Sequence, residues 1–214
     1  MRTKRNMKKF SFILIMLALW FLLVLYPNPR HLAASVYRLK NPPLMPIHVT
    51  EIARQLQGNS PDEIQAFVYN QLPYQYDWEV YNMPWYFPTL DEAMQNGKGD
   101  CKARYLLFAS LMEELDMPYY KNISLTHIWV GYEGKQESTL ENINESMVVV
   151  DGNGQVRLTM PRPDLRRSGQ SFYRGFWEVM PASKKYLLAA GFPFTFGFFF
   201  LCQLTYPLLP TKKK

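Results

Sequence analysis

Two long apolar stretches lie near the ends of the chain. The first, residues 10–26, has 17 consecutive uncharged positions, and the second runs without a charge from Tyr186 to Thr211. A helix needs about 17–25 apolar residues to cross the hydrocarbon core of a bilayer. The pattern therefore predicts membrane-spanning segments at residues 10–26 and 186–209. A cleaved signal peptide is the alternative for the first stretch, although such peptides usually have an apolar run of roughly 7–15 residues.

The region between these stretches changes from a helical to a strand-like pattern. Ser60 followed by Glu63 is a capping-box signal that predicts a helix start. Thr89 opens a second predicted helix, and apolar positions at three- and four-residue steps after Cys101 predict a third. Strand-like runs follow at residues 123–130, 147–150 and 156–160. Helices followed by strands predict an α+β fold with an antiparallel sheet.

Prolines are frequent between the first apolar stretch and the predicted helices, which indicates a stiff tether over residues 27–50. The predicted organisation is a basic tail, a membrane anchor, a Pro-rich tether, a folded domain, a second membrane segment and a Lys-rich tail. In that order, these segments are residues 1–9, 10–26, 27–50, 51–175, 186–209 and 210–214.

The formal net charge of +6 comes from the tails. Eight of the 24 basic residues lie in residues 1–9 and 212–214, whereas all 18 acidic residues lie between these tails. The central region thus carries a slight negative charge, which argues against nucleic acid as a partner. Because basic residues around the first span usually set the orientation, we expect both termini in the cytoplasm and the domain outside. Basic residues shortly before the second span oppose this orientation.

Cys101 has no expected disulfide partner, because the other cysteine, Cys202, lies in the second apolar stretch. The predicted position of Cys101 is the start of a helix, where the helix macrodipole favours a thiolate. Amide groups at the same helix start are suited to stabilising an oxyanion. Cys101 is therefore a candidate nucleophile, and a buried, inert cysteine is the alternative.

A thiol nucleophile needs a base and a group that orients the base. His31 and His48 lie beside the first apolar stretch and in the predicted tether, whereas His127 begins a strand-like run. The candidate acid is Asp151, which directly follows another such run. A histidine with a purely structural role in the core is the alternative for His127. Because zinc-ligand spacings, Gly-rich phosphate loops and G-x-S-x-G motifs are absent from the sequence, we expect no metal and no cofactor.

Several motifs in one order resemble the transglutaminase-like superfamily over residues 60–155. They are the segment Pro88–Lys102 with its Gly-Asp-Cys turn, the His-Ile-Trp-Val run at 127–130, and Val-Val-Asp at 149–151. The resemblance implies a papain-like α+β core in which the cysteine-bearing helix packs on an antiparallel sheet. It implies Cys101 as nucleophile, His127 as base and Asp151 as the residue that orients His127. It leaves the oxyanion partner open between Trp78 and Trp85.

Such a triad supports acyl transfer from an amide through a thioester intermediate. We therefore expect a membrane-anchored thiol peptidase or amidase that acts on a peptide or protein and also contacts the lipid bilayer. A non-catalytic, membrane-tethered binding module with the same fold is one alternative. A true transglutaminase, in which an amine replaces water as the acyl acceptor, is another. Nothing in the sequence indicates the oligomeric state.

Overall fold

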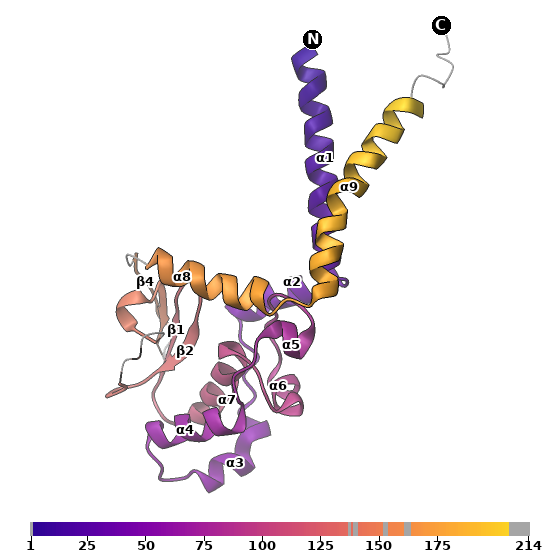
Figure 1. Cartoon of the computed structure of the whole chain (residues 1–214). Helices are drawn as coiled ribbons and strands as arrows, with labels where there is room; N and C mark the ends of the chain where they lie inside the picture. Colours follow the sequence, from indigo (N-terminus) through magenta and orange to yellow (C-terminus); the bar gives the residue numbers. More distant parts are fainter. Residues whose placement is uncertain (1, 137, 139–140, 152–153, 161–163, 206–214) are drawn as a thin grey trace, which may run out of the picture. The chain divides into compact units, whose positions relative to one another are not determined.

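The computed structural model of the chain describes residues 2–136, 138, 141–151, 154–160 and 164–205 (Figure 1). The chain divides into two compact units. The smaller comprises Met1–His31 and Met180–Lys214, and the larger comprises Leu32–Val179. The larger unit contains all three residues of the predicted triad.

The larger unit combines helices with one antiparallel sheet, which confirms the predicted α+β class. Its helices are α2 (Pro29–Lys40), which begins in the smaller unit, α3 (Thr50–Gln55), α4 (Pro61–Gln71), α5 (Asp77–Tyr81), α6 (Leu90–Asn96), α7 (Cys101–Glu114) and α8 (Leu165–Phe172). Shorter helical turns are η1 (Pro46–Val49), η2 (Ile143–Glu145) and η3 (Tyr173–Glu178). The sheet has the order β2-β1-β3-β4. Its strands are β1 (Tyr120–Ile123), β2 (Ile128–Gly131), β3 (Val148–Val150) and β4 (Val156–Leu158).

Local sequence signals set the starts of α4 and α6. Ser60 accepts a hydrogen bond from the Glu63 N–H, while the Glu63 carboxylate accepts one from the Ser60 N–H at 2.7 Å. Thr89 and Glu92 form the same capping box at α6, which ends at Gly97 with a φ of +61°. Each box satisfies N–H groups that have no partner within the helix. Both predicted helix starts are confirmed.

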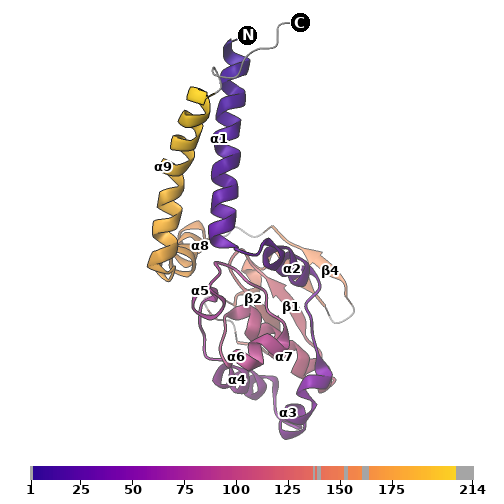
Figure 2. The ribbon, with the colours of Figure 1, turned by 90° about the vertical axis from the view of Figure 1, so that its right-hand side faces the viewer.

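Helix α7 lies at the centre of the larger unit. Eleven of its 14 residues are buried. It packs against β2 of the sheet and against α3, α4, α6 and η1 (Figure 2). Leu106, Leu107 and Leu111 are fully buried, and burial of such a side chain contributes roughly 1.5–3 kcal/mol. This packing fixes the axis of α7 and therefore the position of its first residue, Cys101.

The strand-like run predicted at residues 123–130 is not one strand: it covers the last residue of β1, a tight turn and most of β2. Within the turn, the Ser124 N–H donates to the His127 carbonyl at 2.9 Å, and the His127 N–H donates to Ser124 Oγ at 3.2 Å. These two bonds fix His127 immediately before β2. β1 pairs antiparallel with β2 on one side and with β3 on the other, so it separates those two strands in the sheet.

Residues 27–50 do not form the predicted stiff tether. Pro29 is the first residue of α2, and the next prolines come at positions 42 and 43, after the helix has ended at Lys40. Because proline is tolerated in the first turn of a helix, these prolines bound α2 instead of preventing it. Val49 is 1% exposed and belongs to the core. The folded unit therefore begins well before residue 51.

The smaller unit consists of α1 (Arg2–Leu25) and α9 (Ala182–Thr205), which pack side by side. Trp20 stacks on Phe194 with ring centroids 5.1 Å apart, and its indole N–H donates to the Leu187 carbonyl at 2.9 Å. Gly191 permits this close approach, because a Cβ there would lie 2.3 Å from the Trp20 ring.

No single helix within the described residues has both the length and the apolarity expected of a membrane span. A pair of helices joined by a bend, Ser11–Leu25 and Pro29–Lys40, has them together. A signal sequence or a buried core helix gives the same pattern. The end of the second predicted segment, from residue 206 onward, lies outside the described residues, as does the Lys-rich tail.

Candidate active site

Cys101 lies where the start of α7 meets the segment that precedes α5. The Gly99 N–H donates to the Pro73 carbonyl at 3.2 Å. This pairing brings Tyr74 alongside Gly99, and hence next to Cys101. Gly99 is required for the approach, since a Cβ there would come 2.5 Å from the Ala103 Cβ. The Gly-Asp-Cys turn thus has a steric reason for its glycine.

A buried charge cluster holds the start of α7. Asp100 caps the helix by accepting from the Lys102 N–H at 2.9 Å, and the Lys102 ammonium bonds to Asp100 and, at 2.8 Å, to Asp77. Asp77 also accepts from the Tyr86 N–H at 2.8 Å. Burial and the Asp100 charge raise the pKa of Asp77 to about 7, against the opposing effect of Lys102. The Lys102 ammonium offsets the negative charge that these carboxylates place beside Cys101.

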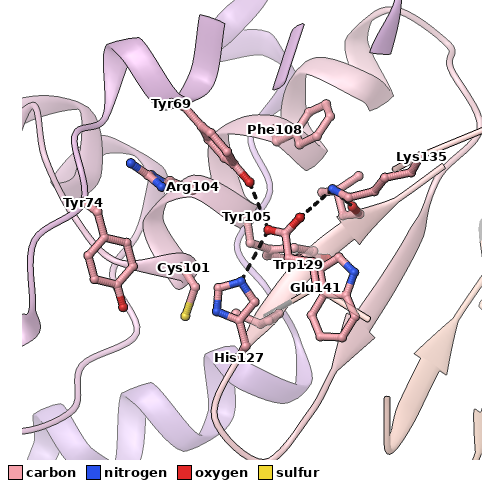
Figure 3. Close-up of a pocket in the computed structure, with 12 residues that line it drawn as sticks. Tyr69, Tyr74, Cys101, Arg104, Tyr105, Phe108, His127, Trp129, Lys135 and Glu141 are labelled. Carbon is pink, nitrogen blue, oxygen red and sulfur yellow. Dashed lines mark hydrogen bonds and ion pairs between the residues drawn. The ribbon is translucent and has the colours of Figure 1, made fainter. Parts of the chain in front are cut away.

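The turn between β1 and β2 places the His127 ring next to the Cys101 sulfur (Figure 3). Burial alone would lower the pKa of His127. The negative charge of a Cys101 thiolate, a hydrogen bond to it and the Glu141 carboxylate outweigh burial and raise this pKa to about 10. The imidazolium form of His127 is therefore favoured, and a histidine placed beside a cysteine sulfur is the arrangement that activates nucleophilic cysteines.

The carboxylate in contact with His127 belongs to Glu141 (Figure 3). Glu141 Oε1 lies 3.4 Å from His127 Nε2 and accepts from the Tyr69 hydroxyl at 2.9 Å, while Lys135 Nζ lies 2.9 Å from Oε2. The side chains of His127, Glu141 and Lys135 are 13%, 11% and 10% exposed. Burial opposes ionisation of Glu141, yet hydrogen bonds and charge from His127 and Lys135 lower its pKa to about 2. Glu141 therefore remains a carboxylate at every pH near neutrality.

Asp151 lies at the opposite end of the sheet from His127. In the register of the strands, His127 adjoins the end of β1 at Ile123, whereas Asp151 adjoins the other end, at Tyr120. The two residues are separated by about 13 Å along the strands and about 10 Å across them. The Asp151 carboxylate accepts from the Gln155 N–H at 2.8 Å within its own turn, and Asp151 does not line the pocket around Cys101. This position does not allow Asp151 to orient His127.

Glu141 is not predicted from the sequence, because it lies in the connection between β2 and β3, outside every predicted element. The indirect signal for it is a polar face on α4. Gln65 accepts from the Tyr132 hydroxyl at 2.8 Å and from Lys135 at 3.0 Å, and Tyr69, one turn later, reaches Glu141. A polar face on a helix that also contributes to the core indicates a buried polar partner.

Neither tryptophan suggested as the oxyanion partner lines the pocket. Trp78 is 2% exposed, and its indole N–H donates to the Phe176 carbonyl at 2.8 Å. Trp85 also lies outside the lining. Tyr74 does line the pocket, with its hydroxyl on the same side as the Cys101 sulfur (Figure 3). Burial and the Cys101 charge raise the pKa of this phenol, so Tyr74 stays protonated and able to donate.

Aromatic rings form much of the pocket wall around Cys101, and these rings limit the access of water to the sulfur. They are the side chains of Tyr69, Tyr74, Tyr105, Phe108 and Trp129. Within the described residues, no three His, Cys, Asp or Glu side chains are grouped as metal ligands.

No protein-family model matches the sequence, and no curated protein is found to be similar to it. Cys101, His127 and Glu141 line one pocket, and such a grouping is a functional indication that the geometry itself supplies.

The Glu141→Gln substitution is expected to lower the pKa of His127 from about 10 by one unit or more, because it removes a negative charge while the ring stays buried. The imidazolium is then lost at a lower pH than in the unmodified protein. NMR titration of the His127 ring in the full chain measures this shift.

Asp151→Asn is the matched control, and it should leave the titration of His127 unchanged because Asp151 is remote from the ring. A shift caused by Asp151→Asn, together with none from Glu141→Gln, would reverse the assignment of the orienting carboxylate.

Proposed function

We propose that this chain is a membrane-anchored, thiol-dependent acyl-transfer enzyme, a cysteine peptidase or amidase with Cys101 as its nucleophile. The observation that carries the proposal is the placement of Cys101 beside a buried His127 ring whose charged form Glu141 stabilises. Burying an imidazolium costs free energy unless a partner charge offsets it. A cysteine that served only in packing would not explain why a buried, paired histidine lies beside it. In this proposal the core is of the transglutaminase-like, papain-like type, with Glu141 in the role expected of Asp151.

The proposed acylation begins when the Cys101 thiolate attacks the carbonyl carbon of an amide. A C–S bond forms, and the electron pair of the C=O double bond moves onto the oxygen. The Cys101 backbone N–H, which has no acceptor within the helix, and the Tyr74 hydroxyl stabilise this oxyanion. The His127 imidazolium protonates the amine nitrogen as the C–N bond breaks. Nδ1 delivers the proton, because Nε2 faces Glu141.

The proposed deacylation returns the site to its starting state. Neutral His127 removes a proton from water while the water oxygen attacks the thioester carbonyl carbon. The C–S bond then breaks, a carboxylic acid leaves, and the thiolate and imidazolium are restored. With an amine in place of water, the product would be a new amide and the enzyme a transglutaminase.

We further propose that α1 and α9 anchor the enzyme in a bilayer, with both termini in the cytoplasm and the larger unit outside. Large apolar side chains of both helices remain exposed although the helices pack on each other, and lipid tails suit such a surface. These side chains are 41% to 64% exposed and include Leu14, Ile15, Leu19 and Leu23 of α1 and Phe192, Phe196, Phe198 and Phe200 of α9. The basic residues that precede the apolar stretch of residues 10–26 favour this orientation.

Replacing Cys101 with Ala is expected to reduce amide turnover by the full chain at least about a thousandfold, because the thioester can no longer form. Release of a fluorescent amine from a peptide-amide library measures turnover. Cys202→Ala is the control, and it should retain both turnover and its inhibition by iodoacetamide.

Undiminished turnover in Cys101→Ala would contradict the proposal. Incorporation of a labelled primary amine in place of hydrolysis would show that the enzyme is a transglutaminase and not a peptidase or amidase. A folded chain that turns over no amide would select the binding module.

Tyr74→Phe is expected to lower kcat by about 10²–10³-fold with a smaller change in KM, because it removes one oxyanion donor. Steady-state kinetics on a substrate found in the first screen measure both constants. Tyr76→Phe is the matched control, since the Tyr76 ring packs edge-on against Tyr74 at 5.4 Å but does not line the pocket. Equal losses in the two variants would argue against an oxyanion role for Tyr74.

Protease added to intact cells is expected to cut the chain between residues 40 and 180, because that unit is proposed to lie outside. An epitope tag at the N-terminus should survive until the membrane is permeabilised. Complete protection of residues 40–180 on intact cells would exclude the proposed topology.

A further inference from the structure

Arg104 lies one helical turn after Cys101 on α7 and lines the same pocket. Residues three apart on a helix lie on the same face, so the two side chains are neighbours. The Arg104 Nε donates to the Leu72 carbonyl at 2.9 Å. The guanidinium lies over the Tyr69 ring at 4.4 Å and the Tyr74 ring at 5.4 Å from the ring centroids. One hydrogen bond and two aromatic rings thus fix the orientation of this cation.

The charges of the pocket leave Arg104 without an anion. Glu141 already contacts both His127 and Lys135. Among the described residues, no carboxylate lies within ion-pair distance of Arg104, and no acceptor is bonded to its two terminal nitrogens. These nitrogens form a planar fork that matches the two oxygens of a carboxylate. The pocket therefore offers a pre-oriented site for an anionic group close to the nucleophile.

The side of Cys101 on which Arg104 lies indicates which part of a substrate carries this group. Figure 3 shows Arg104 and Tyr74 on one side of Cys101 and His127 on the other. His127 protonates the departing amine in the proposed reaction, so the amine lies on the His127 side. The acyl portion then lies on the side of Arg104.

We propose that the substrates are amides whose acyl portion carries a carboxylate near the scissile bond, and that Arg104 selects them by binding this carboxylate. An acidic side chain or a terminal carboxylate in a peptide supplies this chemistry. The selection of substrates rests on the proposed acyl-transfer function, whereas the binding of the anion by Arg104 does not.

The first test compares pairs of amide substrates that differ only in a carboxylate or a carboxamide on the acyl portion. The full chain is expected to prefer the carboxylate by about tenfold or more in kcat/KM, since a hydrogen bond to a charged group contributes about 1.5–3 kcal/mol. Arg104→Gln should abolish the preference mainly through KM, because the contact is the same in the ground and transition states. Arg54→Gln, at an exposed residue paired with Glu51 outside the pocket, should retain it.

The second test needs no turnover and uses the alkylation of Cys101 in the Cys202→Ala background. Iodoacetate carries a carboxylate and iodoacetamide carries the matching amide. The rate of alkylation by iodoacetate, divided by the rate for iodoacetamide, is expected to fall about tenfold in Arg104→Gln and to stay constant in Arg54→Gln. Arg104→Lys, which keeps the charge without the fork, should give an intermediate ratio.

The outcomes separate the two proposals. A ratio that depends on Arg104 in a chain that hydrolyses no amide would support the anion site and refute the peptidase. Hydrolysis with no preference for carboxylate substrates, and an unchanged alkylation ratio in Arg104→Gln, would overturn the anion site alone. If circular dichroism shows that Arg104→Gln does not fold, the unsubstituted chain decides the question. A kcat/KM for the carboxylate substrate that is no higher than that for the carboxamide substrate then overturns the proposal.

Discussion

The site depends on keeping one carboxylate, that of Glu141, ionised in a largely buried position. Three groups achieve this: the Tyr69 hydroxyl, the Lys135 ammonium and the His127 ring. Without them, burial would favour a neutral acid and a neutral imidazole. Gln65 of α4 in turn positions two of these groups, since it accepts a hydrogen bond from Lys135 and donates one to the Tyr69 hydroxyl. The proposed reactivity of Cys101 therefore rests on a polar network that starts on a helix far from it in the sequence.

Cys101, the proposed nucleophile, is placed by packing. α7 is buried on nearly all sides, and its first turn is held by the ion cluster of Asp77, Asp100 and Lys102. A thiolate at Cys101, directly after the buried Asp100, would be disfavoured by Coulomb repulsion if Lys102 were not also present. The same lysine thus stabilises the helix start and adjusts the local potential at the sulfur.

Much of the fold could be predicted because its signals are local. The capping boxes at Ser60 and Thr89, the glycine at position 97 and the apolar spacing after Cys101 each act within a few residues. The order of the strands is not local, because β3 pairs with β1 and not with β2. That pairing moves Asp151 away from His127, and the carboxylate that replaces it comes from an irregular connection. Sequence periodicity carries no information about either fact.

The origin of Glu141 in a connection between strands has a consequence for how the protein would respond to stress. A residue held by a few side-chain contacts can detach through local opening, at a free-energy cost below that of unfolding the core. Detachment of Glu141 would leave α7 and the sheet intact while the imidazolium beside Cys101 loses its support. The reactivity of the thiol would then report how firmly the side-chain contacts of Glu141 hold, and it would decline under mild denaturation before the fold itself is lost.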